Sequence, residues 1–280
     1  PTPSPAPAPA PSRKDIVINI SVGDIAEAEK KDAPVVAPIE IDAAASSADA
    51  EIITINVPAS AGTVSVEIPV RNVTSGTVAV VVRADGTEEI VKTSVVTDTG
   101  LVLGVTGSMC IKIIDNSKFF SDTADHWSRD EVNFVAAREL FNGVGSGRFD
   151  VSGEMTRGMV CTVLARLSGA DTTGGDPWYA RGVAWAVENG VSDGTAPEAS
   201  VTREQLAAML YRYAGSPAVS GELTFADAGS VSAYAKGAML WASQNGIING
   251  VGGGLAAPQA TAERAQVAAM FARYIRLIAK

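Results

Sequence analysis

Three arginines in the second half of the chain stand in front of similar runs of apolar residues. They are Arg157, Arg203 and Arg264. A guanidinium group carries a planar fork of N–H donors that fits a carboxylate, which makes these arginines candidates for contact with an acidic group. The alternative is that each arginine pairs with an acidic neighbour, such as Glu154 or Glu204.

Each arginine is expected in the first turn of a helix. Every residue at offsets +3, +6, +7 and +10 from an arginine is apolar, which is the spacing of one buried helical face. These positions are Val160, Val163, Leu164 and Leu167, then Leu206, Met209, Leu210 and Tyr213, then Val267, Met270, Phe271 and Tyr274. The residues before the arginines are Thr156, Thr202 and Glu263. The free amides and the dipole at such a helix end also favour an anion.

A second set of repeated residues precedes each of these helices. Aromatic pairs seven positions apart are Trp127 and Phe134, Trp178 and Trp185, and Tyr234 and Trp241. A helix is then expected to stop at an Asn-Gly or Asp-Gly turn ending in Gly143, Gly194 or Gly250. The loops from these turns to the next arginine span 15, 10 and 15 positions. The chain therefore contains three helix–loop–helix units, and three such units should share one core because none can bury its apolar face alone.

This repeat resembles the S-layer homology (SLH) family. The first copy carries Phe120-Ser121-Asp122 and Met155-Thr156-Arg157, the second Glu188-Asn189-Gly190 and Val201-Thr202-Arg203, the third Phe225-Ala226-Asp227 and Gln244-Asn245-Gly246. The resemblance covers about 120–277 and implies an all-α pseudo-threefold bundle of repeats at 120–169, 170–219 and 220–280. Two features depart from the pattern: Thr173-Gly174-Gly175-Asp176 replaces the Phe-x-Asp opening, and Glu263, which could repel an anion or pair with Arg264, replaces a threonine.

The resemblance implies grooves between the repeats that bind secondary cell wall polymer, often through a pyruvylated sugar. It therefore implies an exported protein fastened to the wall or S-layer of a Gram-positive or related bacterium. A pyruvyl ketal puts a carboxylate on a sugar, so its recognition needs a cation, hydroxyl donors and a flat apolar face. The expected ligand-binding residues are Arg157, Arg203, Arg264, Trp127, Trp178, Tyr234, Gly143, Gly194 and Gly250. The alternatives are core packing for these aromatics and turn geometry alone for the glycines; the aromatics seven positions on are expected in the core.

The first part of the chain has a β pattern. After a Pro/Ala-rich linker at 1–14, residues 15–114 contain about eight short stretches with strand character, among them 16–22 and the alternating 64–70. Ala84-Asp85-Gly86-Thr87 predicts a hairpin between 78–83 and 89–92. We therefore predict an antiparallel β-sandwich-like module that serves as a spacer or stalk, separated from the repeats by a linker at 115–119.

Composition excludes several classes of function. The net charge of −9 argues against a nucleic-acid binder. His126 is the only histidine, so neither a metal site nor a catalytic base is expected, and we expect no enzyme and no cofactor. Asp122 and Asp227 are expected to cap the following helices, and Cys110 and Cys161 to be free thiols. No stretch reaches the roughly 20 apolar residues of a membrane span.

Two other functions fit the same sequence. The chain could be a structural S-layer subunit whose β module drives lattice assembly, or an adhesin whose β module binds a ligand. A start inside a Pro/Ala tract, with no apolar core of a signal peptide, favours an upstream cargo domain in the same polypeptide. Non-catalytic anchoring to pyruvylated wall polysaccharide is the function that we predict.

Overall fold

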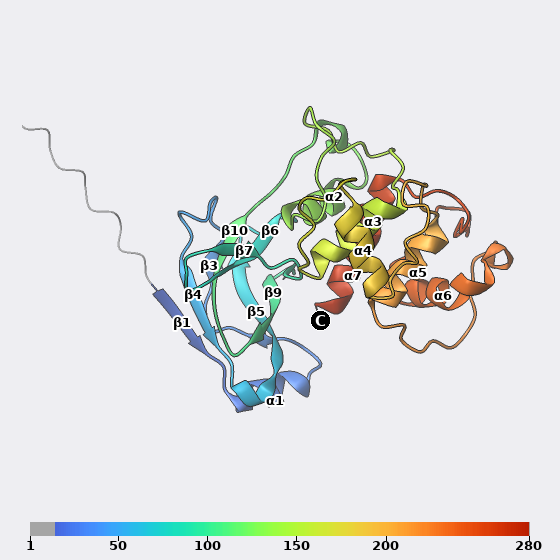
Figure 1. The fold of residues 1–280 in the computed structure, drawn as a ribbon. Coiled ribbons are helices and arrows are strands. Elements are labelled where there is room, and N and C mark those ends of the chain that lie inside the picture. The colour runs from blue at the N-terminus through green and yellow to red at the C-terminus, as the bar shows by residue number, and fades with distance from the viewer. Residues whose placement is uncertain (1–14, 280) are drawn as a thin grey trace, which may run out of the picture.

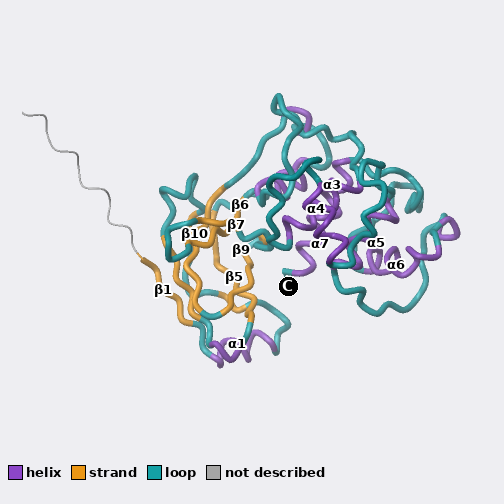
Figure 2. Tube along the Cα trace, viewed as in Figure 1, coloured by secondary structure: helices purple, strands orange, loops and turns teal. Residues whose placement is uncertain are grey.

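The computed structural model describes residues 15–279, so the linker predicted at 1–14 lies outside the described residues. The strands gather in one half of the molecule, and the helices of the repeats form the other half (Figure 1). Long loops join the helices of the repeat half, whereas the strands are joined mostly by short turns (Figure 2).

Two sheets make up the β half. The first has the strand order β1 (Asp15–Asn19), β4 (Ile52–Asn56), β10 (Ser108–Asp115), β6 (Thr77–Val82), β7 (Glu88–Ile90). The second has the order β2 (Val35–Val36), β5 (Thr63–Arg71), β9 (Gly100–Thr106), β8 (Val95–Val96), and β3 (Ile41–Asp42) also pairs with β5. Buried residues of both sheets, such as Ile53, Ile111, Val66 and Leu103, belong to one apolar core.

The prediction of a purely antiparallel module was wrong, because the sheets are mixed. β1 runs parallel to β4, and both β2 and β3 run parallel to β5. A parallel pair needs a long crossover instead of a tight turn, and 32 residues separate β1 from β4. The predicted hairpin is present, since β6 and β7 pair antiparallel across the turn that contains Gly86 (φ 82°).

The strand predicted at 16–22 is also shorter than expected. β1 ends at Asn19 and the helix α1 (Val22–Glu29) begins after Ser21. The Ser21 hydroxyl accepts a hydrogen bond from the Asp24 amide (3.2 Å), and the Asp24 carboxylate accepts one from the Ser21 amide (2.8 Å). This Ser-x-x-Asp capping box was visible in the sequence, and it overrides the β-branched residues that favoured a strand.

Six helices form the repeat half: α2 (Arg129–Ala137), α3 (Arg157–Leu167), α4 (Ala180–Glu188), α5 (Arg203–Tyr213), α6 (Lys236–Gln244) and α7 (Arg264–Ile278). The predicted apolar face is buried on α3, α5 and α7, except that Tyr213 is half-buried. The second helix of each repeat packs on the first helix of another: α3 on α4, α5 on α6 and α7 on α2. All three pairs contribute to one apolar core.

A closed cycle of backbone hydrogen bonds links the three repeats. The residue two positions before each helix-start arginine takes part in it. Met155 N donates to Ala262 O (3.1 Å), Ala262 N to Val201 O (2.9 Å), and Val201 N to Met155 O (2.8 Å). Each repeat therefore makes one donor and one acceptor contact with its neighbours, so the three repeats close into a ring.

Arg138, directly after α2, joins the two halves of the molecule. Its side chain is fully buried, and its guanidinium donates to the carbonyls of Ser94 (2.6 and 2.8 Å), Thr77 (3.2 Å) and Ser75 (3.3 Å) in the β half. It also donates to Phe134 O (2.9 Å) and lies 3.5 Å from the centre of the Phe134 ring. Burial lowers the pKa of Arg138 to about 9, which leaves the group charged at neutral pH.

The segment between the halves lies against α2. Asn116 Nδ2 donates to Ala137 O (2.6 Å), and the Lys118 amide donates to Asn133 Oδ1 (2.7 Å). Val78 and Val80 of β6 pack on Ala137 in a small apolar cluster. Figure 1 shows β6 next to α2, and the two elements are in contact.

Candidate functional site

Each helix-start arginine lines a groove in the repeat half. The Arg157 groove (about 360 Å³) is lined by Arg157, Ser192, Asp193, Thr195, Gln205, Ala208, Met209, Arg212 and Tyr234. The Arg203 groove (about 340 Å³) is lined by Trp127, Arg203, Ile247, Ile248, Asn249, Gly250, Val251, Gln266, Ala269, Met270 and Arg273. The Arg264 groove (about 200 Å³) is lined by Leu140, Phe141, Asn142, Met155, Met159, Thr162, Val163, Arg166, Trp178 and Arg264.

The three grooves follow one assembly rule. One repeat provides the helix-start arginine, a second provides the turn and the helix that follows it, and the third provides the aromatic residue. In the Arg203 groove, for example, the second repeat gives Arg203, the third gives Asn249 and Arg273, and the first gives Trp127. Each groove therefore exists only when all three repeats are assembled, because no repeat holds the complete set.

The guanidinium of Arg157 is neutralised by an acid inside its groove. Its Nη2 donates to Asp193 Oδ1 (2.6 Å) and its Nε to Thr195 O (2.9 Å). Hydrogen bonds from the Thr195 amide and hydroxyl, together with the charge of Arg157, hold the pKa of Asp193 below its usual value. Asp193 is therefore ionised at neutral pH, and Arg157 carries a permanent counter-charge.

Arg203 lies in a groove whose lining includes no Asp or Glu, although the charge of Asp227, outside that lining, raises its pKa in part. It is 4% exposed; its Nε donates to Ala256 O (2.8 Å) and its Nη1 to Gln266 Oε1 (2.9 Å). Among residues 15–279, Nη2 of Arg203 has no hydrogen-bond partner, and since no fully buried side-chain nitrogen is unpaired, this atom is not fully buried. Burial, and then the charge of Arg273, lower the pKa of Arg203.

The guanidinium nitrogens of Arg264 all have partners within the protein. Its Nε donates to Phe149 O (2.8 Å), its Nη2 to Asn142 O (2.9 Å), and its Nη1 contacts Met155 Sδ (3.5 Å). Its Cζ also lies 4.6 Å from the centre of the Phe149 ring. Glu263 forms no ion pair with Arg264 in the described part of the chain, so of the two possibilities for this residue the pairing with Arg264 is not found.

The neighbouring acids that could have paired with the arginines have other partners. Glu154 accepts from the hydroxyls of Ser200 and Thr261 (2.9 Å for Thr261), which lowers its pKa. Glu204, 2% exposed, accepts from the Ser232 amide (2.9 Å) and from the Tyr234 hydroxyl (3.1 Å). The alternative of simple arginine–neighbour pairs is therefore wrong, since the acid that does pair with Arg157 is Asp193.

The first aromatic of each repeat lies on the surface, and the packing alternative for it was wrong. Trp127, Trp178 and Tyr234 are 61%, 52% and 55% exposed and each lines a groove. The second aromatics behave as predicted, because Phe134 and Trp241 are buried and Trp185 is half-buried in contact with Tyr213. Burial, and then the neighbouring Glu204 carboxylate, raise the pKa of Tyr234 to about 12, so its hydroxyl is a donor at neutral pH.

The three predicted glycines do not share one role. Gly194 and Gly250 have left-handed backbone (φ 74° and 84°), whereas Gly143 does not, and only Gly250 lines a groove. A Cβ on Gly143 would lie 2.7 Å from Arg148 O and from the Phe120 ring, and one on Gly250 would lie 2.7 Å from Leu255 O. Turn geometry and close packing therefore account for Gly143 and Gly194.

The helices end earlier than these turns. The left-handed residues after the first helices are Glu139, Gly190 and Gly246 (φ 57°, 67° and 67°). They lie four positions before the glycines that were expected to end the helices.

Asp122 and Asp227 do not cap helices, which corrects that prediction. Asp122 accepts from the amides of Phe149 (2.8 Å) and Asp150 (2.6 Å), and Asp227 from those of Ala256 (2.9 Å) and Ala257 (2.8 Å). These amides belong to the long loops of the first and third repeats. The second repeat lacks the Phe-x-Asp motif, and its loop is five residues shorter. The two differences agree with each other, because without the long loop there are no amides for the motif's carboxylate to hold.

Each groove contains a second arginine that sequence analysis missed. Arg166, Arg212 and Arg273 stand nine positions after the helix-start arginines. Each donates to a carbonyl of the turn in its own groove: Arg166 to Leu140 (3.1 Å), Arg212 to Val191 (3.3 Å) and Arg273 to Ile247 (3.3 Å). The offset of +9 is a fifth position shared by the three copies, but it is charged and so does not belong to the apolar periodicity.

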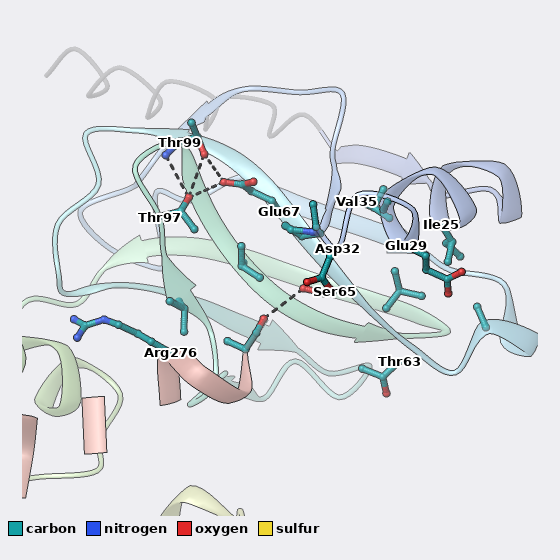
Figure 3. Close-up of a pocket in the computed structure, with 18 of the residues that line it drawn as sticks. Ile25, Glu29, Asp32, Val35, Thr63, Ser65, Glu67, Thr97, Thr99 and Arg276 are labelled. Atoms are coloured by element: carbon teal, nitrogen blue, oxygen red, sulfur yellow. Dashed lines mark hydrogen bonds between the residues drawn. The ribbon is translucent and has the colours of Figure 1, made fainter. Parts of the chain in front are cut away.

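A larger cavity than these three grooves lies elsewhere, between the β half and the end of α7. It measures about 790 Å³ (Figure 3). Its acids include Glu29, Asp32, Glu67 and Asp98, and the hydroxyls of Thr97 and Thr99 donate to Glu67. Arg276, its one arginine or lysine among the lining residues, pairs with Glu131 (2.6 Å). This cavity has no aromatic lining and an acidic character, so it is unsuited to an acidic glycan.

Comparison with known sequences identifies the repeats. The sequence profile of the S-layer homology domain matches residues 119–158, 170–207 and 224–268. The chain contains three S-layer homology domains. SLH domains indicate non-catalytic anchoring at the cell surface and generally bind cell wall polymers, which indicates that the protein is associated with the cell surface.

Two enzymes share sequence with this chain. An amylopullulanase of Thermoanaerobacterium thermosulfurigenes is 30% identical over 174 residues, which cover 55% of this chain and 9% of that protein. An exoglucanase XynX of Acetivibrio thermocellus is 28% identical over 177 residues, covering 56% of this chain and 16% of that protein. The chain thus spans less than a fifth of either relative.

The helices and side-chain clusters of residues 15–279 bear on membrane insertion and on metal binding. Among the helices of residues 15–279, none has the length and apolar character that a bilayer crossing requires. Nor does this part of the chain bring together three or more His, Cys, Asp or Glu side chains in a cluster that could hold a metal ion. His126 instead contacts the hydroxyl of buried Ser128 through Nδ1 (2.7 Å).

Proposed function

We propose that the SLH domains form a pseudo-threefold bundle whose grooves bind an acidic cell wall polysaccharide, with a pyruvylated sugar as the recognised unit. The observation that carries this proposal is the repeated pairing, in each groove, of a helix-start arginine with an exposed aromatic ring. The cyclic backbone hydrogen bonds support the threefold arrangement, as does the packing of each repeat's second helix on the first helix of another repeat.

The chemistry of the grooves fits such a ligand. The guanidinium offers charge-assisted hydrogen bonds to a ketal carboxylate, each worth about 1.5–3 kcal/mol net. An exposed indole or phenol ring offers a flat apolar face to the sugar ring. Three grooves on a repeating polymer would add avidity, because a second binding event on the same polymer becomes intramolecular.

The chain then acts as an anchor, and we propose that the β half is a rigid spacer between the wall and a cargo domain of the same polypeptide. The matches to two much longer enzymes support a cargo, since in both the shared segment is a small part of the protein. The buried contacts of Arg138 support a rigid connection between spacer and anchor.

Co-sedimentation with purified wall polysaccharide, before and after chemical removal of pyruvate, tests this function. The unaltered chain should bind the native polymer and lose most of that binding once pyruvate is removed. The double variant Arg157→Ala/Arg203→Ala should bind neither form, with circular dichroism as a check that it folds. Equal binding of native and depyruvylated polymer would contradict an acidic recognition unit.

A further inference from the structure

The three grooves differ at one position that decides their charge. The residue before the turn glycine is Asn142 in the first repeat, Asp193 in the second and Asn249 in the third. These three residues line the Arg264, Arg157 and Arg203 grooves respectively. Asn and Asp have nearly the same shape, so this substitution changes the charge of a groove and leaves its form nearly unaltered.

We propose, on the basis of the function proposed above, that the grooves are not equivalent. The Arg203 groove takes the acidic group of the ligand, and Asp193 keeps that group out of the Arg157 groove. Asp193 is a specificity-determining residue in this scheme, since it already fills the place of a ligand carboxylate on Arg157.

The Arg157 groove already contains its own carboxylate. Asp193 lies 2.6 Å from Arg157 Nη2, which is the distance of a direct ion pair, and its carboxylate is also held by the Thr195 amide (3.0 Å). A ligand carboxylate would have to displace this internal acid or lie beside it. Displacement loses an existing pair, and two carboxylates at one arginine repel each other. Either route weakens acidic ligands in this groove.

The Arg203 groove has the opposite character. Arg203 and Arg273 both line it, and no Asp or Glu is among its lining residues. Arg203 is more than nine-tenths buried, its Nη2 has no hydrogen-bond partner among the described residues, and Gln266, which accepts from its Nη1, lines the same groove. Asp227, which is not among the lining residues, also acts on Arg203 through its charge. Two like charges that face one cavity destabilise each other, and an anion between them removes that repulsion.

The Arg264 groove is less suited to an acid than the Arg203 groove. Its cavity is about 200 Å³ against about 340 Å³, and most of its lining is apolar, with Met155, Met159 and Val163. All three nitrogens of the Arg264 guanidinium have partners within the protein. A ligand carboxylate there would have to replace contacts that hold the loop of the first repeat.

A reciprocal exchange of Asp and Asn tests the proposal on the full chain. Asn249→Asp puts the internal acid into the Arg203 groove, and Asp193→Asn removes it from the Arg157 groove. The probe is soluble, pyruvylated wall polysaccharide, with the same material after removal of pyruvate as a control, and the readout is isothermal titration calorimetry. Asn19→Asp, in the β half, controls for the added global charge.

Asn249→Asp should weaken binding of the pyruvylated polymer about tenfold or more, because it adds a like charge beside the ligand carboxylate. Asp193→Asn should strengthen binding several-fold or raise the number of sites, and should leave the depyruvylated polymer unaffected. Asn19→Asp should change affinity by less than a factor of two.

Two outcomes separate the inference from the function on which it rests. If the unaltered chain binds the pyruvylated polymer but Asn249→Asp and Asp193→Asn leave its affinity unchanged, the grooves are equivalent and the inference is overturned while wall binding stands. If the unaltered chain binds no pyruvylated polymer, the proposed function fails and the inference fails with it.

Discussion

The first SLH domain and its two successors end their first helix with different residues at the same position. Asn189 and Asn245 each return a side-chain amide to the helix, donating to Trp185 O and Trp241 O (both 2.8 Å). Arg138 makes the corresponding bond to Phe134 O (2.9 Å) and has further donors left over, which reach three carbonyls of the β half.

This difference shows how one copy of a repeat can acquire a second task. A longer side chain with five N–H donors keeps the local cap and adds a connection that asparagine cannot make. In the part of the chain that the structure describes, Arg138 has no acidic partner, so backbone carbonyls and the Phe134 ring compensate for its burial. The first repeat is therefore joined to the β half through hydrogen bonds that depend on precise geometry.

The largest effect is expected from Arg138→Ala. It removes five hydrogen bonds and leaves the buried carbonyls of Ser94 and Thr77 without a donor, which should lower the free energy of unfolding by about 4 kcal/mol. All four tryptophans and all five tyrosines lie in the repeat half, so intrinsic fluorescence follows the repeats, whereas circular dichroism follows both halves. Urea unfolding curves from the two probes should separate in this variant and coincide in the unaltered chain.

A smaller effect is expected from Arg138→Asn, which gives the first repeat the residue of the other two. The bond to Phe134 O should remain, and only the contacts to the β half are lost, so the loss of stability should be about 2–3 kcal/mol. Small-angle X-ray scattering should show a larger radius of gyration as the halves separate. Unchanged scattering together with an unchanged unfolding midpoint would show that Arg138 does not join the halves.

The matched change in the third repeat is Asn245→Ala. It removes one hydrogen bond at the end of α6, which should lower stability by about 1 kcal/mol. Because Asn245 has no contact with the β half in the described residues, fluorescence and circular dichroism should still report one transition. Separate transitions here would mean that loss of any cap, and not the Arg138 contacts, uncouples the halves.

The smallest effect, and a stabilising one, is expected from Glu139→Gly. Glu139 has φ 57°, the left-handed region in which the other repeats place Gly190 and Gly246. A residue with a Cβ costs about 1 kcal/mol in this region. Glycine removes this cost but has greater freedom in the unfolded chain, so the net gain in stability should be about 0.5–1 kcal/mol. The thermal midpoint, measured by calorimetry, should rise by a few degrees; a fall would show that the Glu139 side chain stabilises the fold.

Sequence reasoning found what repeats along the chain and missed what happens between repeats. The arginines at helix starts and the buried faces of α3, α5 and α7 follow from spacing, because helical periodicity is local. The exposure of Trp127, Trp178 and Tyr234 did not follow, since an aromatic at a regular position is usually buried. The role of Asp122 was also out of reach, because the amides that it holds lie 27 to 29 residues away.

In the β half, too, features local to one strand could be predicted from the sequence, and contacts between distant strands could not. Alternation of Val64, Val66, Ile68 and Val70 predicted a strand with one buried face, and β5 has it. The parallel pairing of β1 with β4 could not be predicted, because a strand's own pattern says which face is buried and not which neighbour it meets.

The sequence by itself determined three helix–loop–helix units, their buried faces and the arginine that begins each second helix, because capping and periodicity act within about ten residues. Only the tertiary structure decided which arginine meets which turn and which aromatic, since each groove joins side chains from all three repeats. It also decided that Asp193 neutralises Arg157 and that Arg138 holds the β half. Charges and hydrogen bonds act through space, so residues far apart along the chain determine the chemistry of each groove.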